Sequence, residues 1–265
     1  MKYKTIKWAA GLAICVTSLW AAGSAHGVSI YLRAEKAELT LPDGKSVEMW
    51  GFIQDVDADF TTFETTAGYG FQGSAIKIPS NASGNSLIIH ILNRLDVPVS
   101  AVIPGQNGYV LGQAHGTFLD AQGRTRARSF VKEVPPQLDP AVEDQVGTYV
   151  WQNSTPGTYL LYSGSHSAVQ VQMGLYMPVI REVANNSPYP GYAVSSQRQL
   201  TLLFSEIDPD VHDAVASGEY GTAMTSTIRS KAKYYLINGK AFSLDTPPPA
   251  INIPGNANAP VLLRL

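Results

Sequence analysis

The chain has 265 residues, and its 45% hydrophobic residues are enough to bury a sizeable core. It carries 19 Lys and Arg against 21 Asp and Glu, a net charge of −2, without the basic block that marks a nucleic-acid partner. The 23 Gly and 17 Pro stand between short apolar runs, a pattern that favours strands joined by turns.

The first 25 residues have the pattern of a secretory signal peptide. Lys2, Lys4 and Lys7 precede an uncharged apolar run at 8–22, and the small residues at 23–25 suit peptidase cleavage. The run is short for a membrane span, which needs roughly 20 residues, so a retained anchor is the less favoured alternative. We therefore expect a secreted or periplasmic protein with no membrane span after signal removal. The mature chain would carry 16 basic against 21 acidic residues, a net charge of −5.

Short apolar runs between turn residues predict strands over the next part of the chain. We expect them at 37–41, 47–52, 75–78, 86–92, 98–103, 129–134, 148–151 and 159–162, with a long buried strand or strand pair at 169–180. Arg124, Arg126 and Arg128 alternate and would share one solvated face of a strand. Strands at this spacing, with no interleaved helical pattern, predict a sandwich or barrel.

A Pro/Gly/Asn-rich stretch at 184–191 is interpreted as a linker, and a second unit is expected at 192–265. It begins with a predicted strand at 199–204. Asp208 is a candidate helix cap with Pro209 at the first helical position, so we expect one or two helical turns that end at Gly218. A strand into an Asn-Gly turn follows at 233–239. The last residues, 259–265, form an apolar strand whose partners on one side are absent, so this unit is predicted to be incomplete.

Several motifs together resemble the N-terminal portion of the multicopper oxidase family. They are the strand at 86–95 followed by Val-Pro-Val-Ser at 97–100, Gly-Thr-Tyr at 157–159, Ser-Gly-Ser-His at 163–166 and Gln-Val-Gln-Met-Gly-Leu-Tyr at 170–176. In the second unit, 203–206, 236–239 and 262–264 resemble the start of the family's middle domain. The chain is most similar to bacterial relatives with a Ser-Gly-Thr-His loop.

The resemblance implies an all-β fold of tandem cupredoxin-like Greek-key β-sandwiches, with a first domain at 28–183 and a second, incomplete one at 192–265. It also implies copper-dependent oxidation coupled to dioxygen reduction. The family's first copper motif would fall at 98–101, which contains no histidine, and its second near 163–166, where only His166 remains. The only cysteine, Cys15, leaves with the signal, so neither a disulfide nor a blue-copper thiolate is available.

We therefore predict His166 as the single metal ligand and no catalytic residue, and a truncated N-terminal part inactive alone. Copper would bind weakly unless a missing C-terminal domain, another cupredoxin chain or a homo-oligomer supplied further ligands. The alternative hypothesis is a copper-free binding or structural sandwich that kept the fold and lost the site.

The other histidines are given structural or surface roles by their context. We expect His90 to be a satisfied structural residue on the strand face opposite Ile89 and Ile91. His115 and His212 are expected at the surface, and His26 lies beside the cleavage site. Trp50, Trp151 and Tyr159 are expected in the core.

Overall fold

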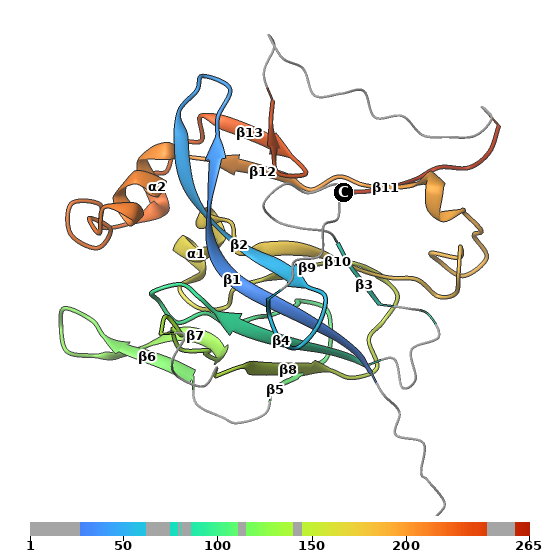
Figure 1. The fold of residues 1–265 in the computed structure, drawn as a ribbon, viewed down its shortest axis with the longest axis horizontal. Coiled ribbons are helices and arrows are strands. Elements are labelled where there is room, and N and C mark those ends of the chain that lie inside the picture. Colours follow the sequence, from blue (N-terminus) through green and yellow to red (C-terminus); the bar gives the residue numbers. More distant parts are fainter. Residues whose placement is uncertain are drawn as a thin grey trace, which may run out of the picture.

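A computed structural model describes residues 27–61, 75–78, 80, 86–110, 115–139, 145–242 and 258–265, without the side chains of 108–110 and 115. The predicted signal peptide and His26 lie outside these residues. None of the described helices is long and apolar enough to cross a membrane. Strands dominate the fold, as the sequence predicted (Figure 1).

The largest sheet has five strands in the order β2-β1-β4-β8-β5. β1 runs antiparallel to β2 and parallel to β4, and β4 runs antiparallel to β8. Alternation along β1 turns Ile30, Leu32 and Ala34 toward the core. The strands of this sheet are β1 (Val28–Thr40), β2 (Ser46–Asp55), β4 (Leu87–Asn93), β5 (Gly108–Val110) and β8 (Gly147–Trp151).

A second layer of three strands, in the order β3-β10-β9, closes the sandwich. β10 (Tyr176–Arg181) lies between β3 (Ile76–Ile78) and β9 (Gly157–Tyr162) and is buried along its whole length. One hydrophobic cluster contains side chains from both layers, which therefore share a core. Its members include Leu32, Phe52, Ile76, Leu87, Ile89, Ile91, Trp151, Leu161, Met177 and Val179.

The segment between β9 and β10 corrects one prediction. We expected a strand or strand pair at 169–180, but a helix, α1 (Ser167–Met173), precedes β10. His166 adopts left-handed φ 40° before the helix, and Gly174 ends it at φ 115°, with its N–H directed to the carbonyls of Gln170 and Val171. An apolar run of this length does not distinguish a strand from a buried helix followed by a strand.

Two further expectations about strands are modified. Residues 98–103 form only isolated bridges, Val99 with Val134 and Val102 with Tyr162, so no regular strand lies there. The strand expected at 129–134 begins earlier, as β7 (Thr125–Lys132), because it forms a hairpin with β6 (His115–Leu119). In Figure 1 this hairpin projects from the sandwich at the lower left.

Residues after 192 form smaller sheets. The strand expected at 199–204 is two strands: β11 (Gln199–Thr201) pairs with β15 (Leu262–Arg264), and β12 (Phe204–Ile207) pairs with β13 (Tyr234–Ile237). Asn238 lies opposite the break, since its Oδ1 accepts a hydrogen bond from the N–H of Leu203 at 2.8 Å. β13 continues through the predicted Asn-Gly turn into β14 (Lys240–Ala241). Short 3-10 turns lie at Ser196–Arg198 and Thr227–Arg229.

The predicted helical turns are confirmed as α2 (Pro209–Ala216). Asp208 caps it, with its carboxylate accepting from the N–H of Asp210 at 3.0 Å, and Pro209 occupies the first turn. Gly218 adopts φ 73° directly after the helix.

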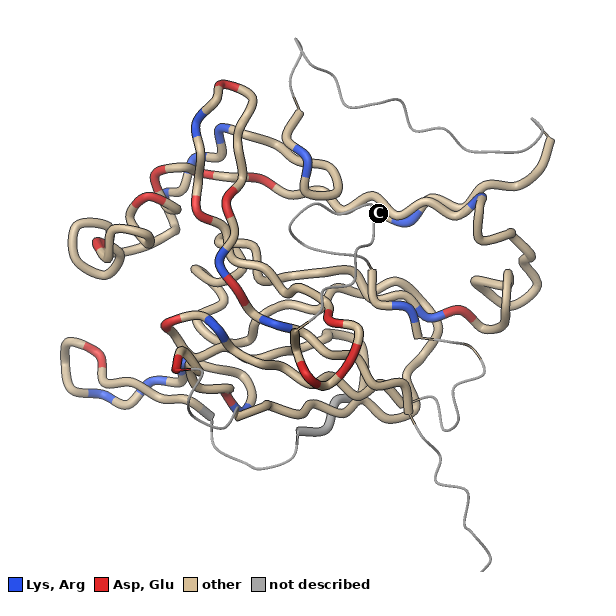
Figure 2. Tube along the Cα trace, viewed as in Figure 1, with Lys and Arg blue, Asp and Glu red and all other residues tan. Residues whose placement is uncertain are grey.

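The later residues pack on the hairpin of β1 and β2. Leu41, Val47 and Met49 share a second apolar cluster with Ile207 and Leu236. Figure 1 shows β12 and β13 beside the end of this hairpin, and Figure 2 shows charges of both signs on the hairpin and acidic residues on α2. One pair, Lys45 with Asp213 at 2.6 Å, joins the two parts. The boundaries at 28–183, 184–191 and 192–265 stay a prediction.

Candidate functional site

The two segments that the resemblance aligns with copper motifs lie side by side. Val102 forms a bridge with Tyr162, and the N–H of Ser100 donates to the hydroxyl of Ser163 at 3.4 Å. Ser129 of β7 forms a bridge with Ser165 on the other side. The residues at 98–101 and 163–166 are therefore in contact in the fold, although about sixty residues of sequence separate them.

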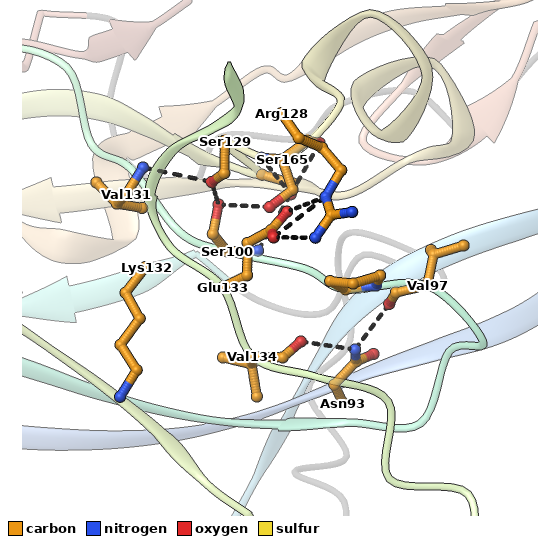
Figure 3. Close-up of polar contacts among 12 residues, drawn as sticks. Asn93, Val97, Ser100, Arg128, Ser129, Val131, Lys132, Glu133, Val134 and Ser165 are labelled. Carbon is orange, nitrogen blue, oxygen red and sulfur yellow. Dashed lines mark hydrogen bonds and ion pairs between the residues drawn. The ribbon is translucent and has the colours of Figure 1, made fainter. Parts of the chain in front are cut away.

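Small polar side chains fill the space between these segments. The hydroxyl of Ser100 bonds to that of Ser129 at 3.0 Å and accepts from that of Ser165 at 3.1 Å (Figure 3). Ser163 donates to the side-chain oxygen of Gln170 at 2.5 Å. The amide nitrogen of Gln170 donates to the carbonyl of Pro98 at 2.8 Å. We call these five polar side chains the serine–glutamine network: Ser100, Ser129, Ser163, Ser165 and Gln170.

The serine–glutamine network is buried and bonded throughout. Ser100, Ser163 and Ser165 have no exposed surface, and Gln170 is 3% exposed. Burying a hydroxyl or amide is costly unless it finds a hydrogen-bond partner, and here each side chain finds one within the network. The atoms that the network could offer to a metal ion are hydroxyl and amide oxygens, whereas copper centres are built mainly from imidazole and sulfur ligands.

His166 stands at the edge of the serine–glutamine network with its backbone held on both sides. Its N–H donates to the carbonyl of Arg128 at 2.8 Å, and its own carbonyl accepts from the N–H groups of Val169 and Gln170. The residue is exposed, and its ring lies tilted against that of Phe118, with 5.9 Å between ring centroids. The structure therefore presents the imidazole at the surface, between β9 and α1.

The charge beside His166 is an ion pair. Arg128 donates from Nε to Oε1 of Glu133 at 3.0 Å and from Nη2 to Oε2 at 2.6 Å, a two-point contact (Figure 3). Partial burial, followed by the positive charge of Arg128, lowers the pKa of His166, and Glu133 opposes this shift. The imidazole therefore favours its neutral form.

A cavity of about 440 Å³ opens next to His166. It lies between α1, β7, β2 and the segment that follows α2, and a second hollow of about 300 Å³ adjoins it at Arg128, His166, Val169 and Tyr220. These sizes are typical of small-molecule sites. The larger cavity is lined by Trp50, Val97, Pro98, Arg128, His166, Val169, Gln170, Val215, Gly218, Tyr220 and Gly221.

The described residues do not fit the copper centre that the family resemblance implies. His166 is the one histidine at the motif positions, and a metal ion on its ring would also meet the positive charge of Arg128. In the part of the chain that the structure describes, no three His, Cys, Asp or Glu residues gather closely enough to hold a metal ion. His166 as a metal ligand stays a prediction.

His90 has the structural role that the sequence predicted. Its Nδ1 lies 3.1 Å from the hydroxyl of Thr148, and its ring stacks on that of Tyr31 at 5.0 Å. Burial lowers the pKa of His90. The side chain of His115 lies outside the described part of the chain.

The expectation that His212 lies at the surface is wrong. Its side chain is 1% exposed, and its Nδ1 lies 2.7 Å from the carbonyl oxygen of Glu48 on β2. Burial lowers the pKa of His212, against the opposing effects of the carbonyls of Glu48 and Gln172. The sequence of α2 alone could not reveal this, because the face that His212 occupies is covered by strands far away in the chain.

The arginines and aromatic residues are placed largely as expected. Arg124 and Arg126 both pair with Asp120 in the β6–β7 hairpin, whereas Arg128 turns to Glu133. The buried Trp50 and Trp151 and the partly buried Tyr159 belong to the core cluster or pack on it, as predicted. The sequence analysis did not single out Gln170, which belongs to the serine–glutamine network, or Tyr220, which lines the cavity. The available signal for the network was the presence of serines at the positions where the family resemblance implies histidines.

Comparisons with known proteins support the fold. No protein-family profile and no curated protein sequence matches the chain. Among solved structures, a multicopper oxidase from Pseudomonas thermotolerans aligns over 83% of this chain at 17% identity with a TM-score of 0.51. The multicopper oxidase mgLAC aligns over 82% at 15% identity (TM-score 0.49), and a laccase from Botrytis aclada over 80% at 20% identity (TM-score 0.46).

The comparison with the Pseudomonas oxidase shows the fold. The chain has the all-β, cupredoxin-like fold of multicopper oxidases, which confirms the fold class that the sequence predicted. It spans 43% of the length of that oxidase, 55% of mgLAC and 31% of the laccase.

Proposed function

We propose that this chain belongs to an exported, multicopper-oxidase-like protein and that its described residues form a copper-free binding unit on the cupredoxin fold. The serine–glutamine network carries the proposal. At the two motif positions where the family resemblance implies copper ligands, buried oxygens bond to one another. Such a set of contacts stabilises the fold. Its oxygens are already hydrogen-bonded and are poor ligands for a soft or borderline metal ion.

Electrostatics at the rim supports the same proposal. His166 is the remaining imidazole, and the positive charge of Arg128 acts on its ring. Weak binding and free exchange are expected for copper on one exposed imidazole, because ligand number and geometry determine selectivity among first-row metals. The cavity beside His166 then becomes the feature that a binding unit would use.

Copper content tests this proposal. The untagged chain is loaded with Cu(II), dialysed, and compared with His166→Ala and with His90→Ala, which removes a histidine outside the motif positions. We expect the same low copper content in all three proteins. Retention of one copper per chain that is lost only in His166→Ala would contradict the proposal.

A second candidate is copper binding by His166 together with ligands from another chain or from a further domain. The observation that favours it is the exposed, neutral imidazole, since the neutral ring is the form that binds metals. Mass measurement of the copper-loaded protein in solution tests it. Supply by another chain requires a copper-dependent dimer or larger assembly, and a copper-free monomer under the same conditions would exclude supply by a second copy.

Export is supported by the pattern of residues 1–25 alone. N-terminal sequencing of the protein recovered outside the cytoplasm should give a mature chain that starts near residue 26. Recovery of the intact N-terminus from the cytoplasmic fraction would contradict export.

A further inference from the structure

The cavity next to His166 has mainly apolar walls that come from separate parts of the chain. Trp50 belongs to β2, Val169 to α1, and Val215 and Tyr220 to the end of α2 and the segment after it. Trp50 is 4% exposed, and its indole N–H is already bonded to Glu48 at 3.0 Å, so what it adds to the cavity is apolar surface. Such walls favour an apolar, ring-shaped body.

Tyr220 is held in place by the turn that follows α2. The N–H groups of Glu219 and Tyr220 both donate to the carbonyl of Ala214, at 2.8 and 2.9 Å. Gly221 then closes the turn with a bond from its N–H to the carbonyl of Met224 at 2.7 Å. Because these backbone bonds fix the turn, little ordering cost remains for a molecule that packs on this ring.

The polar edge of the cavity offers a hydrogen-bond donor without a net charge. Nε and Nη2 of Arg128 are bonded to Glu133, and Nη1 makes no hydrogen bond to the described residues. Glu133 balances the charge of Arg128, and His166 favours its neutral form. A ligand carboxylate would compete with Glu133, and a ligand cation would meet Arg128, so the edge favours an uncharged acceptor.

We propose that this cavity binds an uncharged, mainly apolar aromatic compound that carries one hydrogen-bond acceptor, with the rings against Trp50 and Tyr220 and the acceptor at Nη1 of Arg128. The inference rests on the proposed function, because a binding unit without copper needs a ligand site of its own. The volume of about 440 Å³ has room for a two-ring molecule.

Four naphthalene probes of similar size test the ligand class by equilibrium dialysis against the full chain. They are 2-acetylnaphthalene (uncharged acceptor), 2-ethylnaphthalene (no acceptor), 2-naphthoate (anion) and 2-naphthylmethylammonium (cation). We expect 2-acetylnaphthalene to bind most tightly, about threefold to tenfold better than 2-ethylnaphthalene, as one net hydrogen bond implies. Equal binding of all four probes, or tightest binding of an ion, would overturn the inference.

Two variants locate the binding. Val215→Phe fills the cavity and should abolish binding of 2-acetylnaphthalene, whereas Val183→Phe, the same change at an exposed position, should leave it unaltered. Arg128→Lys keeps a positive partner for Glu133 but removes the planar guanidinium, so it should weaken 2-acetylnaphthalene to the level of 2-ethylnaphthalene. Circular dichroism confirms that each variant is folded.

The outcomes separate this inference from the proposed function. If 2-acetylnaphthalene does not bind, or binds equally well to Val215→Phe, this inference fails while the copper-free proposal stands. If copper is retained through His166, the proposed function fails whatever the probes do.

Discussion

The serine–glutamine network and the contact between α2 and β2 both contain buried polar side chains, but they differ in how completely their polar atoms are bonded. In the network, each hydroxyl and the amide have partners. In the α2–β2 contact, Nδ1 of His212 lies 2.7 Å from the carbonyl oxygen of Glu48, whereas its buried Nε2 makes no hydrogen bond of ordinary geometry to the described residues, although the carbonyl of Gln172 acts on the ring. The first region is satisfied at any ordinary pH, whereas the second depends on the proton of one ring.

The network shows which contacts serines and a glutamine make at the positions that the family resemblance aligns with copper motifs. Ser100 and Ser165 are small enough to be buried where they lie and polar enough to bond to each other. Gln170 reaches from α1 to the carbonyl of Pro98 and ties the two motif segments together. In this chain these positions form a structural contact.

Breaking the serine–glutamine network should have the largest effect. Gln170→Leu keeps the approximate volume but removes the 2.5 Å bond of the Ser163 hydroxyl, which keeps only contacts of 3.3 to 3.5 Å, and the donor to the carbonyl of Pro98. We expect a loss of about 2 to 4 kcal/mol in the free energy of unfolding. Urea unfolding measures this loss. The control is Gln172→Leu, the same change two residues further along α1 at a half-buried position. Equal effects of the two variants would show that the network does not stabilise the fold.

Acid should weaken the α2–β2 contact more than the network. Because burial lowers the pKa of His212, the unfolded chain binds a proton more readily than the folded one as the pH falls below about 6.5. This contribution to stability is present above that pH and is lost below it, by up to about 1.4 kcal/mol per pH unit. The charged groups that act on this ring are Asp208 and Asp213, and both oppose the shift.

Unfolding curves at pH 7.5 and pH 5.5 measure the effect. His212→Gln should reduce the difference in stability between the two pH values, while Gln170→Leu should leave that difference as in the wild type. An unchanged pH dependence in His212→Gln would mean that other groups, such as His90, cause it.

Removing the cap of α2 should have a smaller effect than breaking the serine–glutamine network, and it tests how this helix is anchored. Asp208 accepts from the N–H of Asp210 and, across the fold, from the N–H of Lys231 at 2.6 Å. Asp208→Ala should cost about 1 to 2 kcal/mol. Asp210→Ala, which removes only an exposed pair with Lys233, should cost less. A larger loss in Asp210→Ala would contradict the account of the cap.

The features that the sequence predicted correctly are local ones. Alternation placed His90 on the opposite face from Ile89 and Ile91, and Asp208 with Pro209 marked the start of α2. These outcomes depend on residues within one or two turns of each other, so the neighbouring sequence contains the physical cause.

The features that the sequence did not predict depend on distant contacts. The burial of His212 needs Glu48 of β2, and the burial of Gln170 needs Pro98. The helix α1 was not predicted because its apolar run is equally compatible with a strand. Gly174, which ends the helix, was a local signal for it. The resemblance was enough to align the motif positions with the sequence. The hydrogen bonds between the serines and Gln170 at these positions could be seen only in the structure.

The most direct test of the central claim is the copper content of the purified full chain after Cu(II) loading and dialysis, measured beside its His166→Ala variant. The account predicts equal, low values in the two proteins, because the motif positions hold the serine–glutamine network. Stoichiometric copper in the wild type alone would contradict it.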